Sequence, residues 1–337
     1  MKAWQLTAIG AEHLALVTLP DPEPGPGEVL VRFAAAAPNP RDSQIISGQF
    51  TPDLPLPLVP LSDGAGTVAA VGAGVTRFAE GDRVAACFFP NWIEGEALAD
   101  ERKTSGGLES PGVLREYGVY PDHALVKGPD TLSAVELACF PCAGLTAWTA
   151  LVEKSAIGAG DWVLIQGTGG VAMAALNIAN GLGAHSIVLS SSVERLAQAT
   201  ALGAYATINY VDTPAWGDAA YKLSGHGVDA VVEIGGAGTM AQSLAAIRHG
   251  GHINIIGYMA GVALDTTVFP LIIRNANLHG IGTGHRTALE ALLDFTARHD
   301  QHPVISHRFP FDKAPDALAT LDAGGFMGKV VIDYAAG

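Results

Sequence analysis

The residues of this chain with the clearest chemical signature form a glycine-rich turn, Gly167-Thr168-Gly169-Gly170. An apolar run over 163–165 precedes the turn, and apolar and small residues at helical spacing over 171–182 follow it. A strand, a glycine turn and a helix in this order bring backbone N–H groups and the positive helix end beside a phosphate. We therefore expect the pyrophosphate of a dinucleotide at this turn, against Gly167, Thr168, Gly169, Gly170 and Val171. A glycine turn without a ligand is the alternative.

The kind of dinucleotide is predicted by the polar residues about 20 positions further on. NAD sites usually hold an Asp or Glu there, which accepts a hydrogen bond from the ribose 2′-hydroxyl. This chain has Ser190 and Ser191 at that place and Arg195 shortly after. No carboxylate would repel a 2′-phosphate, and a guanidinium can bind it. The sequence therefore predicts NADP (NADPH) as cofactor, although a serine before an amphipathic helix is also a common N-cap.

Short apolar runs that alternate with helical patterns would position these residues. The expected strands are 163–165, 186–189, 206–208, 230–233, 252–256 and 278–281, with further helices over 133–139, 144–154 and 288–298. This alternation predicts an α/β fold with a doubly wound parallel Rossmann sheet and ligands at the carboxyl ends of its strands. Residues 1–125 instead show short runs rich in Gly and Pro, which predicts a mostly antiparallel β domain. A polar, loop-like insertion covers 93–112.

Composition limits the remaining classes of function. The 337 residues carry a formal net charge of −14 without a basic run, which argues against nucleic acid and anionic membranes as partners. The three cysteines have neither a disulfide framework nor a metal-knuckle spacing. No stretch approaches the roughly 20 apolar residues of a membrane span. The first residues lack the apolar segment of a secretion signal, so we expect a cytoplasmic protein.

Several separated blocks are similar to the medium-chain dehydrogenase/reductase superfamily, most of all to its zinc-free, quinone-reductase-like branch. They are 39–50 (NPRDSQIISGQF), 56–72, 142–151, 163–176, 250–261 and 324–332 (GGFMGKVVI). The resemblance implies a GroES-like catalytic domain over 1–127 and 285–337, a Rossmann domain over 128–284, and a nicotinamide between them. It also implies cofactor contacts from Thr146, Tyr210, Gly235, Gly257, Thr283 and Lys329. For Lys329, an exposed lysine at the start of an edge strand is the alternative.

The zinc ligands of the alcohol-dehydrogenase branch are mostly missing from the corresponding positions. Asn39 stands where that branch has its first Cys ligand, and Ser62 and Asp63 stand where it has a His–Glu pair. Only Cys142 matches the second Cys ligand. A catalytic zinc needs about three N, S or O ligands from the protein, and Asn and Ser are poor ones. We therefore expect no metal, with Cys142 as a small buried side chain near the cofactor.

Without a metal to stabilise an alkoxide, hydride addition to an electron-poor acceptor is the easier reaction. The expected activity is NADPH-dependent reduction of a quinone or an α,β-unsaturated carbonyl compound. The resemblance to the quinone-reductase branch implies that the stretch 39–42 lies near the nicotinamide, where Asn39 would hydrogen-bond the substrate carbonyl and Asp42 would fix Arg41 or the local loop. Tyr258 is the candidate proton donor, with solvent as the alternative. Aromatic and aliphatic residues over 50–54 and 88–92 predict a small hydrophobic substrate.

Two other classes of function stay open. One is a zinc-type alcohol dehydrogenase with an unconventional site of Asp63, Cys142 and a third ligand. The other is a non-catalytic NADPH-binding protein such as a sensor, because a fold alone does not establish an activity. The family also suggests a homo-oligomer, a dimer or a tetramer, with the apolar strand 278–281 at its contact.

Overall fold

The computed structural model describes residues 1–102, 105–263 and 268–335. The chain forms two compact units. The first unit comprises Met1–Leu145, Gly284–Gly325 and Lys329–Gly337, and the second comprises Thr146–Thr283 and Phe326–Gly328. Among the described residues, no helix is both long enough and apolar enough to cross a membrane.

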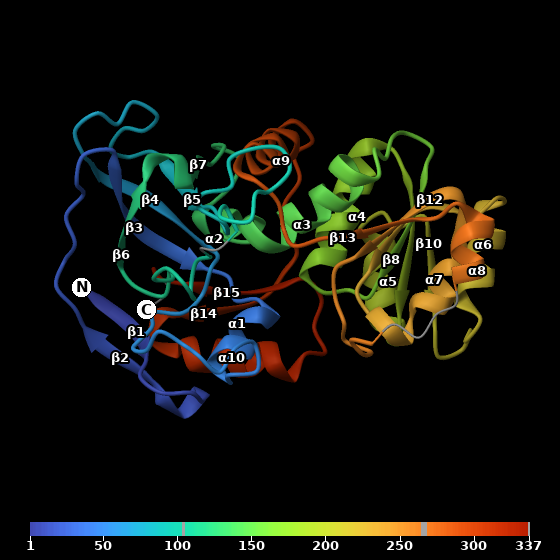
Figure 1. Ribbon diagram of the computed structural model, residues 1–337, viewed down its shortest axis with the longest axis horizontal. Helices are drawn as coiled ribbons and strands as arrows, with labels where there is room; N and C mark the ends of the chain where they lie inside the picture. The colour runs from blue at the N-terminus through green and yellow to red at the C-terminus, as the bar shows by residue number, and fades with distance from the viewer. Residues whose placement is uncertain (103–104, 264–267, 336–337) are drawn as a thin grey trace. The chain divides into compact units, whose positions relative to one another are not determined.

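The first unit is built on a seven-stranded, mostly antiparallel sheet (Figure 1). Its strands lie in the order β14 (Ile305–Pro310), β15 (Lys329–Asp333), β3 (Glu28–Ala36), β4 (Gly64–Val71), β5 (Arg83–Ala86) and β7 (Leu125–Lys127), and β6 (Tyr117–Pro121) also pairs with β3. Alternate residues of β3, namely Val29, Val31 and Phe33, are buried, as the two-residue period of a strand requires. Because β15 pairs with β3, the last strand of the chain belongs to this sheet.

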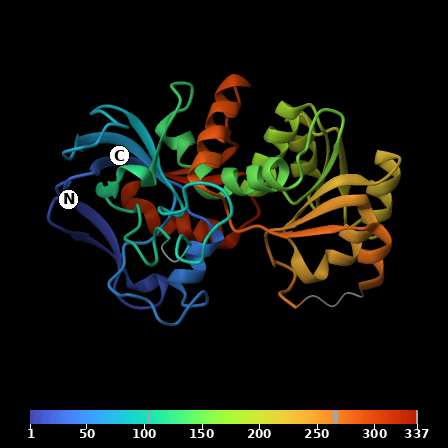
Figure 2. The same ribbon diagram turned by 45° about the horizontal axis from the view of Figure 1, so that its top comes forward.

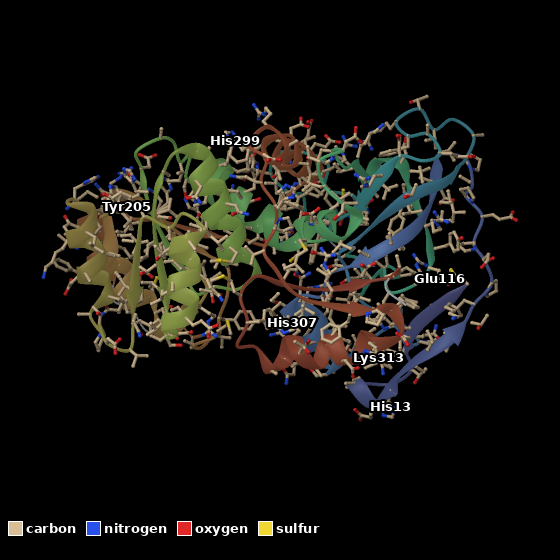
Figure 3. The ribbon with its side chains drawn as sticks, turned by 180° about the vertical axis from the view of Figure 1, so that it is seen from behind. His13, Glu116, Tyr205, His299, His307 and Lys313 are labelled. Atoms are coloured by element: carbon tan, nitrogen blue, oxygen red, sulfur yellow. The ribbon has the colours of Figure 1, made fainter. Side chains whose placement is uncertain are left out.

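Helices and a hairpin complete the first unit. The helices are α1 (Pro40–Ile46), α2 (Ala134–Leu137), α9 (Arg286–Arg298) and α10 (Ala314–Ala323). Helix α2 packs against β3, β4 and β5, so residues 128–145 group with the first unit, whereas the sequence assigns them to the Rossmann domain. The hairpin consists of β1 (Lys2–Leu6) and β2 (Leu14–Thr18). The Glu116 carboxylate accepts a hydrogen bond from the Lys2 backbone N–H in β1 (Glu116 is labelled in Figure 3).

The second unit contains a six-stranded parallel sheet (Figure 2). Its order is β10 (Ala206–Asn209), β9 (His185–Ser190), β8 (Trp162–Gln166), β11 (Val228–Glu233), β12 (Ile247–Ile255) and β13 (Asn277–Gly280). Strand order reverses between β8 and β11, which is the switch point where doubly wound sheets bind ligands. The predicted fold class, a doubly wound Rossmann sheet beside a mostly antiparallel domain, is therefore confirmed.

Helices α4 (Gly170–Leu182), α5 (Val193–Ala201), α6 (Trp216–Ser224), α7 (Met240–Ala246) and α8 (Val268–Arg274) flank this sheet. The helix expected over 144–154 is only partly an α-helix. Its α-helical part, α3 (Leu145–Trp148), lies between two wider π-helical turns, Phe140–Gly144 and Thr149–Lys154. Pro141, which has no backbone N–H to donate, stands in the first of these turns. Turns of this kind are frequent at functional sites.

Candidate active site

The glycine turn joins β8 to α4 in the second unit, as its sequence predicts. Gly167 has φ +78°, a conformation that favours glycine. Gly169 has an ordinary φ of −75°, and a Cβ built on it would meet no described atom within 4 Å. Neither backbone strain nor packing within the chain explains a glycine there. Open space over a helix N-terminus fits the close approach of a pyrophosphate.

A buried carboxylate holds the turn in place, and sequence reasoning missed it. Glu233, at the end of β11, accepts hydrogen bonds from the Gly235 N–H at 3.0 Å, the Gly236 N–H at 2.9 Å and the Gln166 side-chain amide at 2.7 Å. The Ser243 hydroxyl donates to the same carboxylate. Because Gln166 directly precedes Gly167, this network fixes the loops after β8 and β11 relative to each other. The sequence did carry a signal for this network: Gln166 and Glu233 are polar residues at the ends of otherwise apolar strands.

The residues predicted to bind the 2′-phosphate follow β9 and β10. The Ser192 hydroxyl, not that of Ser190 or Ser191, caps α5 by accepting the Arg195 N–H at 3.2 Å. Ser190 is buried, and its hydroxyl accepts the Ser192 N–H at 3.1 Å. The Tyr210 N–H donates to the Ser190 carbonyl at 3.3 Å, which places β9 and β10 side by side at their carboxyl ends. The N-cap interpretation therefore applies to Ser192 alone.

The other predicted cofactor residues of the second unit divide into two groups. Thr146 and Thr283 are buried hydroxyl residues, and Thr283 has a left-handed φ of 62°. Gly235 and Gly257 are glycines for reasons internal to the chain. A Cβ on Gly235 would lie 2.3 Å from the Thr239 hydroxyl, and one on Gly257 would lie 2.4 Å from the Ile234 carbonyl. Their lack of a side chain is therefore no evidence for a ligand.

In the first unit, Lys329 and Asn39 meet in a buried polar cluster. The Lys329 ammonium donates to Asn39 Oδ1 at 2.6 Å, to the Pro38 carbonyl at 2.9 Å and to the Ala37 carbonyl at 3.5 Å. Lys329 is the first residue of β15, and 37–39 directly follow β3, so the sheet brings them together. Only 7% of Lys329 is exposed, so the interpretation as an exposed edge lysine is wrong.

Asp63 is the fully buried carboxylate of this cluster. Its Oδ1 accepts the Ser62 hydroxyl at 2.7 Å, and its Oδ2 accepts the Cys142 N–H at 3.0 Å. Burial raises the pKa of Asp63, while Lys329, Ser62 and a hydrogen bond from the Asn39 amide oppose that rise. Burial also raises the pKa of the Cys142 thiol far above its ordinary value. A thiol in this environment is a poor source of a thiolate.

These residues do not fit a catalytic zinc. The Asn39 oxygen is bound to an ammonium, both Asp63 oxygens accept hydrogen bonds, and burial raises the pKa of the Cys142 thiol. Within 1–102, 105–263 and 268–335, no group of three or more His, Cys, Asp or Glu side chains could hold a metal ion. The third ligand of the unconventional zinc site is therefore missing from the described residues.

Asp42 lies in the same unit, at the start of α1. Its Oδ2 accepts the Asn39 N–H at 2.8 Å, which closes the first turn of the helix. Asp42 is 1% exposed, and burial raises its pKa to about 6 against the lowering effect of Arg41. The Arg41 guanidinium lies 3.9 Å from Asp42 Oδ1, which is close enough for an ion pair between these neighbouring side chains.

Arg41 also anchors the end of the 93–112 insertion. Its guanidinium donates to the Gly106 carbonyl at 3.1 Å and to the Ser105 hydroxyl, and Ser105 is buried. Residues 105–112 are thus largely packed against the first unit rather than forming a solvated loop, and 103–104 of the insertion lie outside the described residues. The same guanidinium stacks on Phe50 and Phe88, with 5.3 and 4.9 Å to their ring centroids.

Aromatic side chains surround the position of Cys142. Phe88, Phe89 and Trp92 form a buried cluster against which Cys142 packs, in agreement with an apolar acceptor site. The structure therefore brings Asn39, Asp42 and Lys329 together with aromatic residues in the first unit. Tyr258, which is 50% exposed, belongs to the second unit with the predicted residues of the glycine turn.

A chain that combines a doubly wound sheet with an open glycine turn and a β domain with a buried polar cluster is typical of a nucleotide-dependent oxidoreductase of two domains. Two family models agree: an alcohol dehydrogenase GroES-like domain matches residues 25–130, and a zinc-binding dehydrogenase domain matches 170–298. The chain belongs to the medium-chain dehydrogenase/reductase superfamily. Nicotinamide cofactors are the coenzymes of these dehydrogenases.

Individual relatives carry several names. A zinc-type alcohol dehydrogenase-like protein of Schizosaccharomyces pombe is 39% identical, with 91% of each chain covered. A 2-methylene-furan-3-one reductase of Solanum lycopersicum is 30% identical over 98% of this chain and 79% of its own. The crystal structure of a NAD-dependent alcohol dehydrogenase is 35% identical with a TM-score of 0.91, covering 99% of this chain and 100% of that one.

Proposed function

We propose that this chain is a zinc-independent, NADPH-dependent oxidoreductase that transfers hydride to a quinone or an α,β-unsaturated carbonyl compound. One observation carries the proposal: an ammonium group, not a set of metal ligands, is bound to Asn39 at the positions that correspond to the zinc site. An alkoxide has no Lewis acid there, whereas a conjugated acceptor spreads the incoming charge over its own carbonyl. The reductase of Solanum lycopersicum acts, by its name, on such an enone.

The residues of the second unit would hold the cofactor, which supplies the hydride. The N–H groups of the glycine turn, from Gly167 to Val171, would bind the pyrophosphate. Ser190, Ser191 and Arg195 would bind the 2′-phosphate, and Tyr210 would lie beside the adenosine. The name of the NAD-dependent structural relative points the other way, so the choice of NADPH rests on Arg195 and on the absence of a carboxylate after β9. Lys329, Thr146, Gly235, Gly257 and Thr283 remain proposed cofactor contacts.

The residues of the first unit would shape the acceptor site. Asn39 and Asp42 are buried and mutually hydrogen-bonded, so they hold the start of α1 rigid beside the aromatic cluster. Reduction of a quinone or an enone by hydride also consumes a proton. Tyr258, whose phenol is half exposed, or solvent would supply it.

We also propose that the protein is a cytoplasmic homo-oligomer. Strand β13 is an edge of the parallel sheet, and an unpaired edge can add a second copy. Helix α8 of the same unit exposes Val268, Phe269, Ile272 and Ile273, which favours burial against another subunit.

The test is consumption of NADPH, followed by absorbance, with a simple quinone, a simple enone and a simple alcohol series, and with NADH as the comparator. Turnover of the quinone or the enone that survives a chelator is the expected result. Turnover of alcohols with NADP⁺ only after zinc is added would instead establish the alcohol dehydrogenase that the relative of Schizosaccharomyces pombe is named for. Binding of NADPH without turnover of any of these compounds would support the non-catalytic NADPH-binding protein instead.

A further inference from the structure

The Lys329 side chain is unusual because its charge is buried and fully hydrogen-bonded inside one unit. A lysine ammonium has three N–H donors, and three acceptors surround this one: Asn39 Oδ1 and the carbonyls of Pro38 and Ala37. Burial of a lone charge is costly, so a buried lysine needs opposite charges nearby. The residues around it must therefore supply negative charge.

Two buried carboxylates supply it. Asp63 is fully buried, and Lys329 lowers its pKa against the effect of burial. Asp42 is buried on the other side of Asn39, where Arg41 and Lys329 act on it in the same direction. Burial thus raises the pKa of both carboxyl groups, and the two cations lower it again, Lys329 at both carboxyl groups and Arg41 at Asp42.

Asn39 lies between the charges and is oriented by them. Its oxygen accepts from the Lys329 ammonium at 2.6 Å, its amide nitrogen donates to the Ala37 carbonyl at 3.3 Å, and its side chain lowers the pKa of the nearby Asp63. The Ala37 N–H donates in turn to the Asp63 backbone carbonyl at 2.9 Å, and Asp63 Oδ2 accepts the Cys142 N–H at 3.0 Å. Asn39, Asp63 and Cys142 stand at positions that correspond to zinc ligands in the alcohol-dehydrogenase branch. Lys329 comes from the last strand.

We infer that the ammonium of Lys329 is the resident cation of this site and takes the electrostatic place of the catalytic metal. It balances the charge of Asp63 and fixes the orientation of the Asn39 amide. Lys329 is thus a positioning residue that acts through Asn39, and its charge opposes the entry of a divalent cation. The inference deepens the zinc-independent part of the proposed function and needs no particular acceptor.

The first test asks whether Lys329 keeps zinc out. The variant Asn39→Cys/Ser62→His restores a cysteine and a histidine at the corresponding positions beside the native Asp63 and Cys142. A second variant adds Lys329→Met. After dialysis against zinc and then buffer, we expect about one equivalent of zinc in the triple variant and almost none in the double variant, by metal analysis. Equal zinc in both folded variants, or none in a folded triple variant, would overturn the inference.

The second test measures the charge coupling and does not depend on a rebuilt site. Lys329→Met leaves Asp63 buried without its counter-charge, so Tm should fall by roughly 5–15 °C. Adding Asp63→Asn should recover most of the loss, because the double change removes both charges. Lys127→Met is the matched control: Lys127 pairs with Asp82 at 2.6 Å but is 62% exposed, so Tm should change by less than about 3 °C.

Losses of Tm that simply add in Lys329→Met/Asp63→Asn would contradict the charge balance, whatever the zinc result. Neither measurement uses a substrate. A failure of the quinone and enone assay would therefore leave the inference about Lys329 unaffected. A negative result in the zinc or Tm measurements would overturn the inference about Lys329 and would leave the proposed reductase activity unaffected.

Discussion

Replacement of Asp42 by Asn should make the protein's stability less dependent on pH. Burial raises the pKa of Asp42 from 3.8 to about 6, and Arg41, Asp63 and Lys329 are the charged groups that act on it. Its ionisation therefore opposes folding. The stability that comes from the neutral carboxyl is complete below the ordinary pKa and is lost as the pH rises through the pKa of the folded state.

The size of the effect follows from the pKa values of the unfolded and the folded state. A tenfold difference between their acid dissociation constants corresponds to about 1.4 kcal/mol, so ionisation of Asp42 costs about 3 kcal/mol at pH 8 and about 1.6 kcal/mol at pH 5. Asn has no charge to bury, and its oxygen can still accept the Asn39 N–H. Any cost of its buried NH2 group is the same at every pH. The free energy of unfolding of Asp42→Asn relative to wild type should therefore rise by about 1.4 kcal/mol between pH 5 and pH 8.

Urea unfolding at a series of pH values, followed by tryptophan fluorescence, measures this difference. Asp82→Asn is the control, because the hydrogen bond from Lys127 lowers the pKa of Asp82 and its contribution is already complete at pH 5. Its loss of stability should be constant from pH 5 to pH 8. A constant difference for Asp42→Asn as well, or one that falls with pH, would refute the assignment of a buried, neutral-favouring carboxyl.

Four further changes test the cofactor site, the packing near it and the assembly. Gly169→Ala adds a Cβ that meets no described atom, so Tm should stay within about 2 °C while KM for NADPH rises at least roughly tenfold. Gly257→Ala should instead lower Tm, because its Cβ would lie 2.4 Å from a carbonyl. Arg195→Gln should reduce the preference for NADPH over NADH in kcat/KM by about 10–100-fold. Ile272→Glu, on the exposed face of α8, should lower the oligomer mass in light scattering; an unchanged mass would place the contact elsewhere.

The Rossmann sheet could be predicted because its signals are local. Each strand core is a short apolar run, and the glycine turn follows β8 directly in the sequence. Strand β12 extends further than expected, over Ile247–Ile255, because it continues past an irregular register beside β11. The boundary of the first unit was harder to predict from the sequence. Residues 128–145 have the apolar spacing of helices, but they group with the antiparallel sheet of the first unit. Periodicity identifies a helix and not the sheet that it covers.

The site was only partly predictable for the same reason. Resemblance to the superfamily located Asn39, Asp42, Asp63 and Cys142 and predicted that they make a poor zinc site. It gave no sign of the hydrogen bonds that bury Lys329, because the partners are carbonyls and an amide about 290 residues earlier in the chain. Pairing of β15 with β3 is what brings them together, and a contact at that separation leaves no local pattern.

The buried lysine also changes what the loss of a zinc site means for the chemistry. Removing metal ligands one by one would leave Asp63 as an uncompensated buried charge, which a folded protein tolerates poorly. The cation from the last strand lowers that cost, and it also holds the oxygen of the Asn39 amide at 2.6 Å. Only the amide nitrogen of Asn39 could donate to a substrate carbonyl, and one of its N–H groups already donates to the Ala37 carbonyl at 3.3 Å. In the proposed reductase, stabilisation of the reduced acceptor would therefore rest mainly on donors other than Asn39.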